Sequence, residues 1–388
     1  MASAPSEAPT SVPASAASAP AQAGAGAPAP GVPGAGVPGA GVFAAPAAEH
    51  RALREGCGLL DRSQRGKLAL TGPDAVEFLN GQITNELDGV RPGEGRYAAF
   101  LTHKGKMLGD MRVLVVGAGG AAGPSDAGSD GPSKAGAADG ENGPLELLLD
   151  TERACLQALF DVIRRYKVGY GVELHKRTLE RGLLSLIGPR AGAVAGVDGL
   201  REDEHAHAPA QIGGVEALAV RTDVGVDLLC EAQDAQALAD AQLARGALAV
   251  SEDAAECLRV ERGRPRYGID LDATVIPQEA GLNERAVSFT KGCYVGQETV
   301  ARLFYKGRPN RRLRGLRLSA PAHGGRELLA GERVVGRLGS VAVSPAHGPI
   351  ALALVRREAE PGAILALAGE PGAGAVSAEV TELPFAQR

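Results

Sequence analysis

This sequence of 388 residues contains few cysteines, and their spacing matches no metal-binding motif. The five thiols lie far apart, without a Cys-x-x-Cys pair, at Cys57, Cys155, Cys230, Cys257 and Cys293. Zinc sites and most cluster-binding motifs need such pairs, so we expect no stable metal site. Unpaired cysteines and the lack of an export signal are typical of a reducing cytoplasm, the compartment that we predict.

Long apolar runs are also missing. No stretch approaches the roughly 18 consecutive apolar residues that cross a bilayer, so we expect no membrane span. Aromatic residues make up only 3% of the chain, and none interrupts the basic run at residues 308–314. Together with a net charge of −5, this argues against nucleic-acid binding.

Two segments lack the side chains that a core requires. Residues 1–44 are rich in Pro, Ala, Gly and Ser and carry a single charge, Glu7, which predicts a disordered tail. Residues 117–143 form a second low-complexity tract between the apolar runs 111–116 and 145–149. We predict that these runs are two strands of one hairpin and that the tract is its mobile loop.

The rest of the chain is long enough for a large core, and its pattern predicts the α+β class. Strand-like runs alternate irregularly with helical ones and are mostly joined by short turns, which favours antiparallel sheets. The predicted strands include 66–71, 183–187, 215–220 and 226–230, and the predicted helices include 233–246 and 252–262.

A further helix is expected after the hairpin. Asp150 or Thr151 is a suitable N-cap, since both residue types accept hydrogen bonds from the first turn of a helix. The apolar residues that follow recur at helical spacing and predict one buried face, made of Cys155, Leu159, Ile163 and Tyr166.

From about residue 311 the pattern changes to short strands broken by glycine. Even spacing of this kind predicts a small antiparallel β-barrel over residues 311–388. It would follow an α+β region at residues 45–310, made of two lobes. The expected barrel strands are 313–318, 333–338, 339–343, 350–355 and 363–368.

Residues 291–298, Lys-Gly-Cys-Tyr-Val-Gly-Gln-Glu, are the strongest candidate for a site, and we call them the octapeptide. Polar groups are dense there, and its glycines let the backbone bend or approach a ligand. Lys291 lies two residues from Cys293, and a nearby cation favours the reactive thiolate. The alternative is a buried cysteine that packs as a small hydrophobe.

Several motifs together resemble one family. They include Leu-Thr-Gly-Pro-Asp-Ala at 70–75, Phe-Leu-Asn-Gly-Gln-Ile-Thr-Asn at 78–85, Lys-Gly-Lys-Met at 104–107 and the octapeptide. Their order and spacing over residues 48–388 resemble the YgfZ-type folate-binding proteins, relatives of the aminomethyltransferase of the glycine cleavage system. The octapeptide is the most specific part of this resemblance.

The resemblance implies a three-lobed fold that ends in the barrel and binds tetrahydrofolate, or a one-carbon derivative of it, in a central cavity. It also implies a role in the assembly or repair of iron–sulfur clusters, with client or assembly proteins as partners. By position Cys293 would be the working residue. A thiolate there is able to ligate iron transiently or to take part in redox chemistry.

The same resemblance suggests which residues contact the folate. Asp110 matches an aspartate near the reactive nitrogen, Tyr97 matches a lining position, and Asp227 falls where the transferases hold the pterin with a glutamate. Further candidates come from the octapeptide: Lys291, Tyr294, Gln297 and Glu298.

Folate-dependent aminomethyl or one-carbon transfer through Asp110 is the alternative function, and a ligand-binding regulator without turnover also stays open. Two departures argue against transfer: Ala255 replaces an arginine of the transferase pattern, and Arg264 stands where those enzymes place a tyrosine. Whether the protein is an enzyme is left open. His205 and His207 have acidic neighbours and a following Ala-Pro, which predicts a surface loop rather than a metal site.

Overall fold

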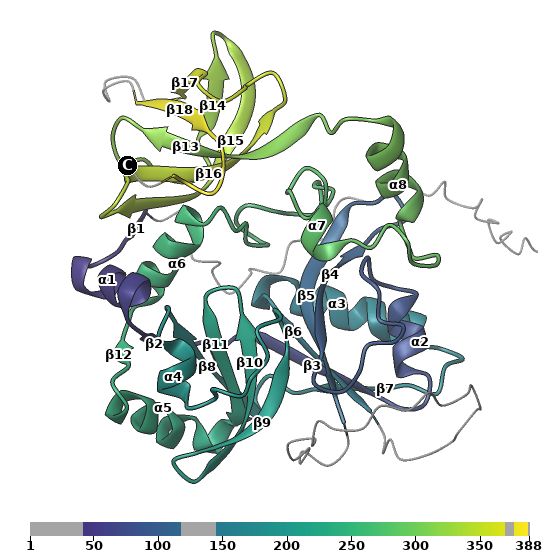
Figure 1. Ribbon diagram of the computed structural model, residues 1–388. Coiled ribbons are helices and arrows are strands. Elements are labelled where there is room, and N and C mark those ends of the chain that lie inside the picture. Colours follow the sequence, from purple (N-terminus) through teal and green to yellow (C-terminus); the bar gives the residue numbers. More distant parts are fainter. Residues whose placement is uncertain (1–41, 118–144, 369–375, 387–388) are drawn as a thin grey trace, which may run out of the picture. The chain divides into compact units, whose positions relative to one another are not determined.

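The computed structural model describes residues 42–117, 145–368 and 376–386. Within these ranges the strands form three sheets whose pairings are antiparallel with two exceptions, and helices pack against them (Figure 1). The predicted α+β class with antiparallel sheets is confirmed. Most of the predicted tail and of the predicted loop lies outside the described residues. None of the helices in these ranges is long and apolar enough to cross a membrane.

The first sheet has five strands in the order β4-β5-β6-β3-β7. The predicted hairpin is confirmed, because β5 pairs with β6 and sets Val116 opposite Glu146. One face of the sheet is covered by apolar side chains that it shares with α2 (Ala75–Asn80) and α3 (Arg153–Tyr166). The strands are β3 (Gly66–Thr71), β4 (Gly95–Leu101), β5 (Met107–Val116), β6 (Glu146–Thr151) and β7 (Glu173–Lys176).

Helix α3 follows the sequence prediction in its centre and departs from it at both ends. Cys155, Leu159 and Ile163 are buried as predicted, but Tyr166, the last residue of the helix, is 49% exposed. The predicted cap is also wrong, since Glu152 occupies the N-cap position. Asp150 is the penultimate residue of β6, where its carboxylate pairs with arginines and is not available to the helix.

The second sheet has six strands in the order β12-β2-β8-β11-β10-β9, and α4 (Ala191–Ala195) and α5 (Ala235–Ala244) contribute to its core. The predicted strands at 183–187, 215–220 and 226–230 are confirmed. The strands are β2 (Gly58–Asp61), β8 (Arg181–Ile187), β9 (His207–Ile212), β10 (Val215–Thr222), β11 (Gly225–Glu231) and β12 (Leu248–Ala249).

The predicted C-terminal barrel is confirmed, because β15 pairs with both β14 and β16 and thereby closes six strands. The two strands predicted at 333–338 and 339–343 are one strand, β15, with an irregularity between Leu338 and Val341. The strands are β13 (Arg311–Leu318), β14 (Glu327–Ala330), β15 (Arg333–Ser344), β16 (Gly348–Arg356), β17 (Ile364–Leu367) and β18 (Ser377–Thr381).

The predicted tail is too long by three residues. Val42–Ala44 form a strand, β1, that pairs in parallel with β15 and lies beside the barrel in Figure 1. Phe43 is buried there among residues of the barrel and of α6 (Glu252–Glu261). Burial of one large aromatic side chain offsets the conformational entropy that a short segment loses when it becomes ordered. The composition of residues 1–44 as a whole did not indicate this local exception.

Candidate functional site

A small polar cavity of about 170 Å³ is the first candidate site, and we call it the Asp110 pocket. Its walls come from β4, β5 and β6 of the first sheet, from β8 and β11 of the second, and from segments next to these strands. Most of its lining residues are charged or polar, which favours a polar ligand. The ionisable lining residues are Arg62, Arg65, Tyr97, Asp110, Arg112, Asp150, Glu204, His205, Asp223, Asp227 and Arg285.

Asp110 and Tyr97 form a hydrogen-bonded pair in this pocket. The antiparallel register of β4 and β5 sets Ala99 opposite Asp110, so Tyr97 is a diagonal neighbour of the carboxylate. The Tyr97 hydroxyl donates to Asp110 Oδ2 at 2.6 Å. Burial raises the pKa of Asp110 to about 6, although the hydrogen bond from Tyr97 acts in the opposite direction. A carboxyl group of this kind is able to exchange a proton near neutral pH.

Arg112 connects two acidic groups of the pocket. Its guanidinium lies 2.7 Å from Asp227 Oδ2 and 2.9 Å from Asp150 Oδ2. Ser185 donates its hydroxyl to the other oxygen of Asp227 at 2.7 Å. Asp227 therefore lines the pocket as the resemblance implies, but both of its carboxylate oxygens already have protein partners. A ligand that binds this carboxylate has to share it with Arg112.

Arg285 covers the aromatic face of Tyr97. Its guanidinium carbon lies 4.7 Å from the ring centroid, and the same side chain is paired with Glu204. Cation–π contact and ion pair together hold the Tyr97 ring in place beside Asp110. Arg285 belongs to the segment that leads to the octapeptide, so this segment contributes to the pocket although the octapeptide does not.

The surface loop predicted for His205 and His207 is wrong, because the two side chains are only 7% and 6% exposed. The segment folds back against the first sheet, where the His207 amide donates to Gly93 O at 2.9 Å. The two His207 ring nitrogens lie 3.0 and 2.9 Å from His205 O and Val115 O, and the neutral ring donates to one of these carbonyls. His205 lines the Asp110 pocket. Local polarity suggested a loop, and only the tertiary contacts bury it.

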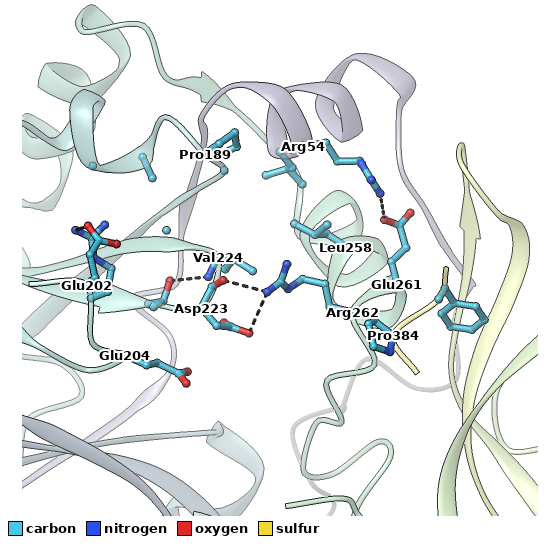
Figure 2. Close-up of a pocket in the computed structure, with 18 of the residues that line it drawn as sticks. Arg54, Pro189, Glu202, Glu204, Asp223, Val224, Leu258, Glu261, Arg262 and Pro384 are labelled. Carbon is cyan, nitrogen blue, oxygen red and sulfur yellow. Dashed lines mark hydrogen bonds and ion pairs between the residues drawn. The ribbon is translucent and has the colours of Figure 1, made fainter. Parts of the chain in front are cut away.

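A larger cavity of about 640 Å³ adjoins the Asp110 pocket, and we call it the outer cavity. Figure 2 shows its wall, where Arg262 Nη2 donates to the backbone oxygen of Asp223 at 3.1 Å. Arg54 reaches Glu261 at 3.1 Å in the same view. The two cavities are continuous in their lining, since they share Glu204, Thr222, Asp223 and Val224.

The octapeptide lies elsewhere, and its lysine has a structural task. Lys291 is 7% exposed, and its ammonium is bonded to Asn80 O, Asn80 Oδ1, Ile83 O and Asn85 O at 2.7 to 3.0 Å. Burial lowers the pKa of Lys291 to about 8, while these oxygens favour its charged form. The ammonium therefore holds the loop after α2 in place, and the argument that it activates Cys293 loses its basis.

A second contact joins the octapeptide to the turn of the Lys-Gly-Lys-Met motif. Gly296 has a φ of +86°, and a Cβ there would lie 2.6 Å from Thr102 O. A Cβ on Gly105 would lie 2.8 Å from Thr299 Cβ, in α8 (Gln297–Lys306). Only glycine fits either position. Three motifs that are distant in sequence thus meet in one framework.

This framework leaves one thiol at the surface. Cys293 is exposed, whereas the other four cysteines of the chain are buried. Tyr294 packs into a core cluster with Leu101 and Met107, and Gln297 begins α8 next to the exposed Glu298. None of the residues 291–298 lines the Asp110 pocket or the outer cavity.

Among the described residues, His50, Cys257 and Glu261 have the spacing of a metal site. Glu261 is already bonded to His50 Nε2 at 2.7 Å and to Arg54 at 3.1 Å. Burial raises the pKa of Cys257 to about 12, so its thiol is protonated at neutral pH. A metal cation would be repelled by the Arg54 charge and would find a neutral thiol instead of a thiolate ligand. We therefore interpret the cluster as part of the packing between α1 (Ala47–Glu55) and α6.

Sequence reasoning missed several pocket residues. A usable signal existed only for Arg112, a cation inside the apolar run of β5, because a buried charge requires a partner. No local pattern marks the other ionisable residues of the pocket, which are Arg62, Arg65, Asp150, Glu204, His205, Asp223 and Arg285.

Comparisons with known proteins identify the family of this chain. Residues 28–119 match the GCVT N-terminal domain, and residues 311–387 match the glycine cleavage T-protein C-terminal barrel domain. The aminomethyltransferase of Streptomyces avermitilis is 31% identical over 336 residues, which cover 79% of this chain and 80% of that protein. The chain belongs to the aminomethyltransferase family.

A further relative is similar in sequence, and a solved structure is similar in fold. The protein of that name from Streptomyces coelicolor is 29% identical and covers 79% of this chain and 80% of its own length. The crystal structure of the glycine cleavage aminomethyltransferase T from Bartonella henselae has a TM-score of 0.71 at 24% identity, covering 88% and 90% of the two chains. These relatives identify the family as a whole rather than its YgfZ-type branch.

Proposed function

We propose that this protein binds tetrahydrofolate, or a one-carbon derivative of it, and serves the assembly or repair of iron–sulfur clusters through Cys293. The observation that carries the proposal is the arrangement of the octapeptide. Its lysine, tyrosine and second glycine support the structure, and its cysteine is the one thiol of five that faces solvent. A segment built in this way presents a sulfur atom to a partner.

The two cavities together suit a folate. The Asp110 pocket, at about 170 Å³, is smaller than the roughly 300 to 1,000 Å³ of typical ligand sites, but the outer cavity adds about 640 Å³. We assign the pteridine ring to the Asp110 pocket and the aminobenzoyl-glutamate portion to the outer cavity. Arg54 and Arg262 line that cavity and suit the carboxylates of the glutamate.

Asp110 and Tyr97 are the proposed polar contacts of the pteridine. A carboxyl group whose pKa is about 6 is able to accept a hydrogen bond from a ring nitrogen when ionised and to donate one when protonated. Tyr97 keeps its proton at neutral pH, because burial and Asp110 hold its pKa well above the usual value. Asp227 contributes through the oxygens that it shares with Arg112 and Ser185.

Cys293 would act as a thiolate. On losing its proton to solvent, the sulfur is able to ligate cluster iron transiently, which is the ligand type that iron–sulfur clusters use. An iron–sulfur client or an assembly protein is the proposed partner. The four other cysteines are buried and do not reach a partner without local unfolding.

Aminomethyl transfer, the activity named in the relatives, is the second candidate. The buried Asp110 favours it, since a group that titrates near neutral pH suits proton transfer. Two observations weigh against it. Asp227 is engaged by Arg112, and Arg264, which stands where the transferases place a tyrosine, is paired with Asp223 at 2.8 Å.

The two functions are separated by complementation of a host that lacks its own protein of this type, scored by iron–sulfur enzyme activity. We expect Cys293→Ser to fail although it folds and binds folate like wild type, and Thr290→Ser, an exposed neighbour, to complement fully. Full complementation by Cys293→Ser would refute the role of the thiol. If only Asp110→Ala fails and purified protein transfers a one-carbon unit, the transferase candidate replaces the proposal.

A further inference from the structure

His205 has hydrogen-bonding capacity that the protein does not use. Its side chain is buried and lines the Asp110 pocket, and neither ring nitrogen has a hydrogen-bond partner among the described residues. The nearest carboxylate oxygen, Glu204 Oε1, lies 3.7 Å from Nε2, which is beyond hydrogen-bond range. A buried polar group without a partner costs free energy, so its presence requires a reason.

Among the described lining residues, only Arg112 shares part of this property, because its Nε and Nη2 have no hydrogen-bond partner although its guanidinium is ion-paired. Arg112 is paired with Asp150 and Asp227, Arg285 is paired with Glu204, and Tyr97 donates to Asp110. These groups have protein partners before any ligand arrives. His205 therefore stands out as a lining group whose donor and acceptor are both unused.

The backbone holds His205 in this position at a cost. Its φ is +71°, the only positive value among the described non-glycine residues. Its amide donates to Arg221 O at 2.9 Å, which anchors the strained residue to β10. Gly95 at the start of β4 leaves the necessary space, since a Cβ there would lie 2.8 Å from His205 Cβ. Strain that the surrounding structure maintains is typical of functional positions.

The ring is neutral at physiological pH. Burial lowers the pKa of His205 to about 3, and the Arg112 and Arg285 cations act in the same direction. Asp223, Asp150 and the adjacent Glu204 favour the charged form but do not overcome burial. A neutral imidazole has one N–H donor and one bare nitrogen that accepts. A ligand that bonds to both ring nitrogens must carry a hydrogen-bond acceptor and a hydrogen-bond donor close together on one polar edge.

We propose that His205 is a ligand-binding residue that recognises the pteridine ring through hydrogen bonds from one ring nitrogen and to the other. This inference rests on the proposed folate function, and it adds the residue that selects the ligand. The amino-oxo edge of a reduced pteridine carries both an accepting oxygen and donating N–H groups. The aminobenzoyl-glutamate portion would lie in the outer cavity, which His205 does not line.

The test measures Kd by calorimetry on the full chain with two probes, 5-formyltetrahydrofolate and p-aminobenzoylglutamate, which lacks the pteridine. We expect His205→Phe to weaken the first probe about tenfold or more, because both proposed hydrogen bonds are lost, and to leave the second unchanged. His207→Phe is the matched control. It should lower the melting temperature, because it removes the hydrogen bond that the ring donates to a backbone carbonyl, and change neither Kd.

His205→Asn covers the case in which the Phe variant does not fold, since asparagine tolerates a positive φ. Its shorter side chain should weaken 5-formyltetrahydrofolate about threefold or more at a native melting temperature. Equal binding of this probe to wild type and a folded His205 variant would overturn the inference and leave the proposed function intact. A wild-type chain that binds neither probe would overturn both.

Discussion

The buried carboxyl group of Asp110 predicts a pH-dependent free energy of unfolding, which can be measured without knowing the ligand. Asp110 is 5% exposed, and burial raises its pKa to about 6, above the value of an unfolded aspartate. The folded protein therefore holds this proton more tightly than the unfolded chain does. Its stabilising contribution is present below about pH 4 and is lost as the pH rises through about 6. Asp110→Asn, which stays neutral, should keep the stability that wild type loses.

The expected size follows from the two pKa values. At pH 8 both states of wild type are ionised, and a difference of about two units corresponds to about 3 kcal/mol in favour of Asp110→Asn. At pH 5 the native carboxyl is mostly protonated, and the advantage falls to about 1.5 kcal/mol. The asparagine oxygen still accepts from the Tyr97 hydroxyl, so the hydrogen bond is retained.

The assay is urea unfolding of wild type and Asp110→Asn at about pH 5, 6.5 and 8 in a constant salt concentration. Other titrating groups cancel in the difference between the two proteins. Asp88→Asn, an exposed aspartate, is the control and should stay within about 0.5 kcal/mol of wild type throughout. An Asp110→Asn variant that is less stable than wild type at pH 8, or an advantage that does not shrink toward pH 5, would refute the reasoning.

Three further predictions concern the octapeptide. In the native protein a thiol-reactive disulfide should modify one of the five cysteines within minutes, and none in Cys293→Ser; a fast second thiol would contradict the burial of the others. Lys291→Met should lower the free energy of unfolding in urea by about 3 kcal/mol, because buried and partly buried oxygens of Asn80, Ile83 and Asn85 lose their donor; a neutral effect would show that the ammonium is dispensable. Gly296→Ala should lower the free energy of unfolding by about 2 kcal/mol, because Gly296 has a positive φ and a close backbone neighbour. Gly292→Ala, where neither applies, should change it by almost nothing, and equal melting temperatures of the two variants would contradict this.

Much of the fold was predictable from local patterns. Barrel strands β13, β15, β16 and β17, the β5–β6 hairpin and the centre of α3 follow from the spacing of apolar residues, because strand and helix periods depend on which side chains face a core. Strands β14 and β18 of the barrel were not predicted. The errors lie where a long-range contact decides the outcome. Phe43 extends the fold into the predicted tail because the barrel and α6 provide a place for its side chain.

The site was predictable only in part. Resemblance indicated Asp110, Tyr97 and Asp227, and all three line one pocket. Their states were not predictable, since the pKa of Asp110 depends on burial and the carboxylate of Asp227 depends on Arg112. His205 was assigned to a surface loop because acidic residues precede it and Ala-Pro follows it, a local pattern typical of exposed loops.

The sequence by itself determined the element types, the barrel and the presence of a thiol in a polar segment, because these depend on residues close together in the chain. Only the tertiary structure decided what the polar groups do. Lys291 is bonded to Asn80, 211 residues away, so its charge supports a loop rather than the thiol of Cys293. The roles of buried charges depend on partners that folding brings together, and no spacing along the chain specifies them.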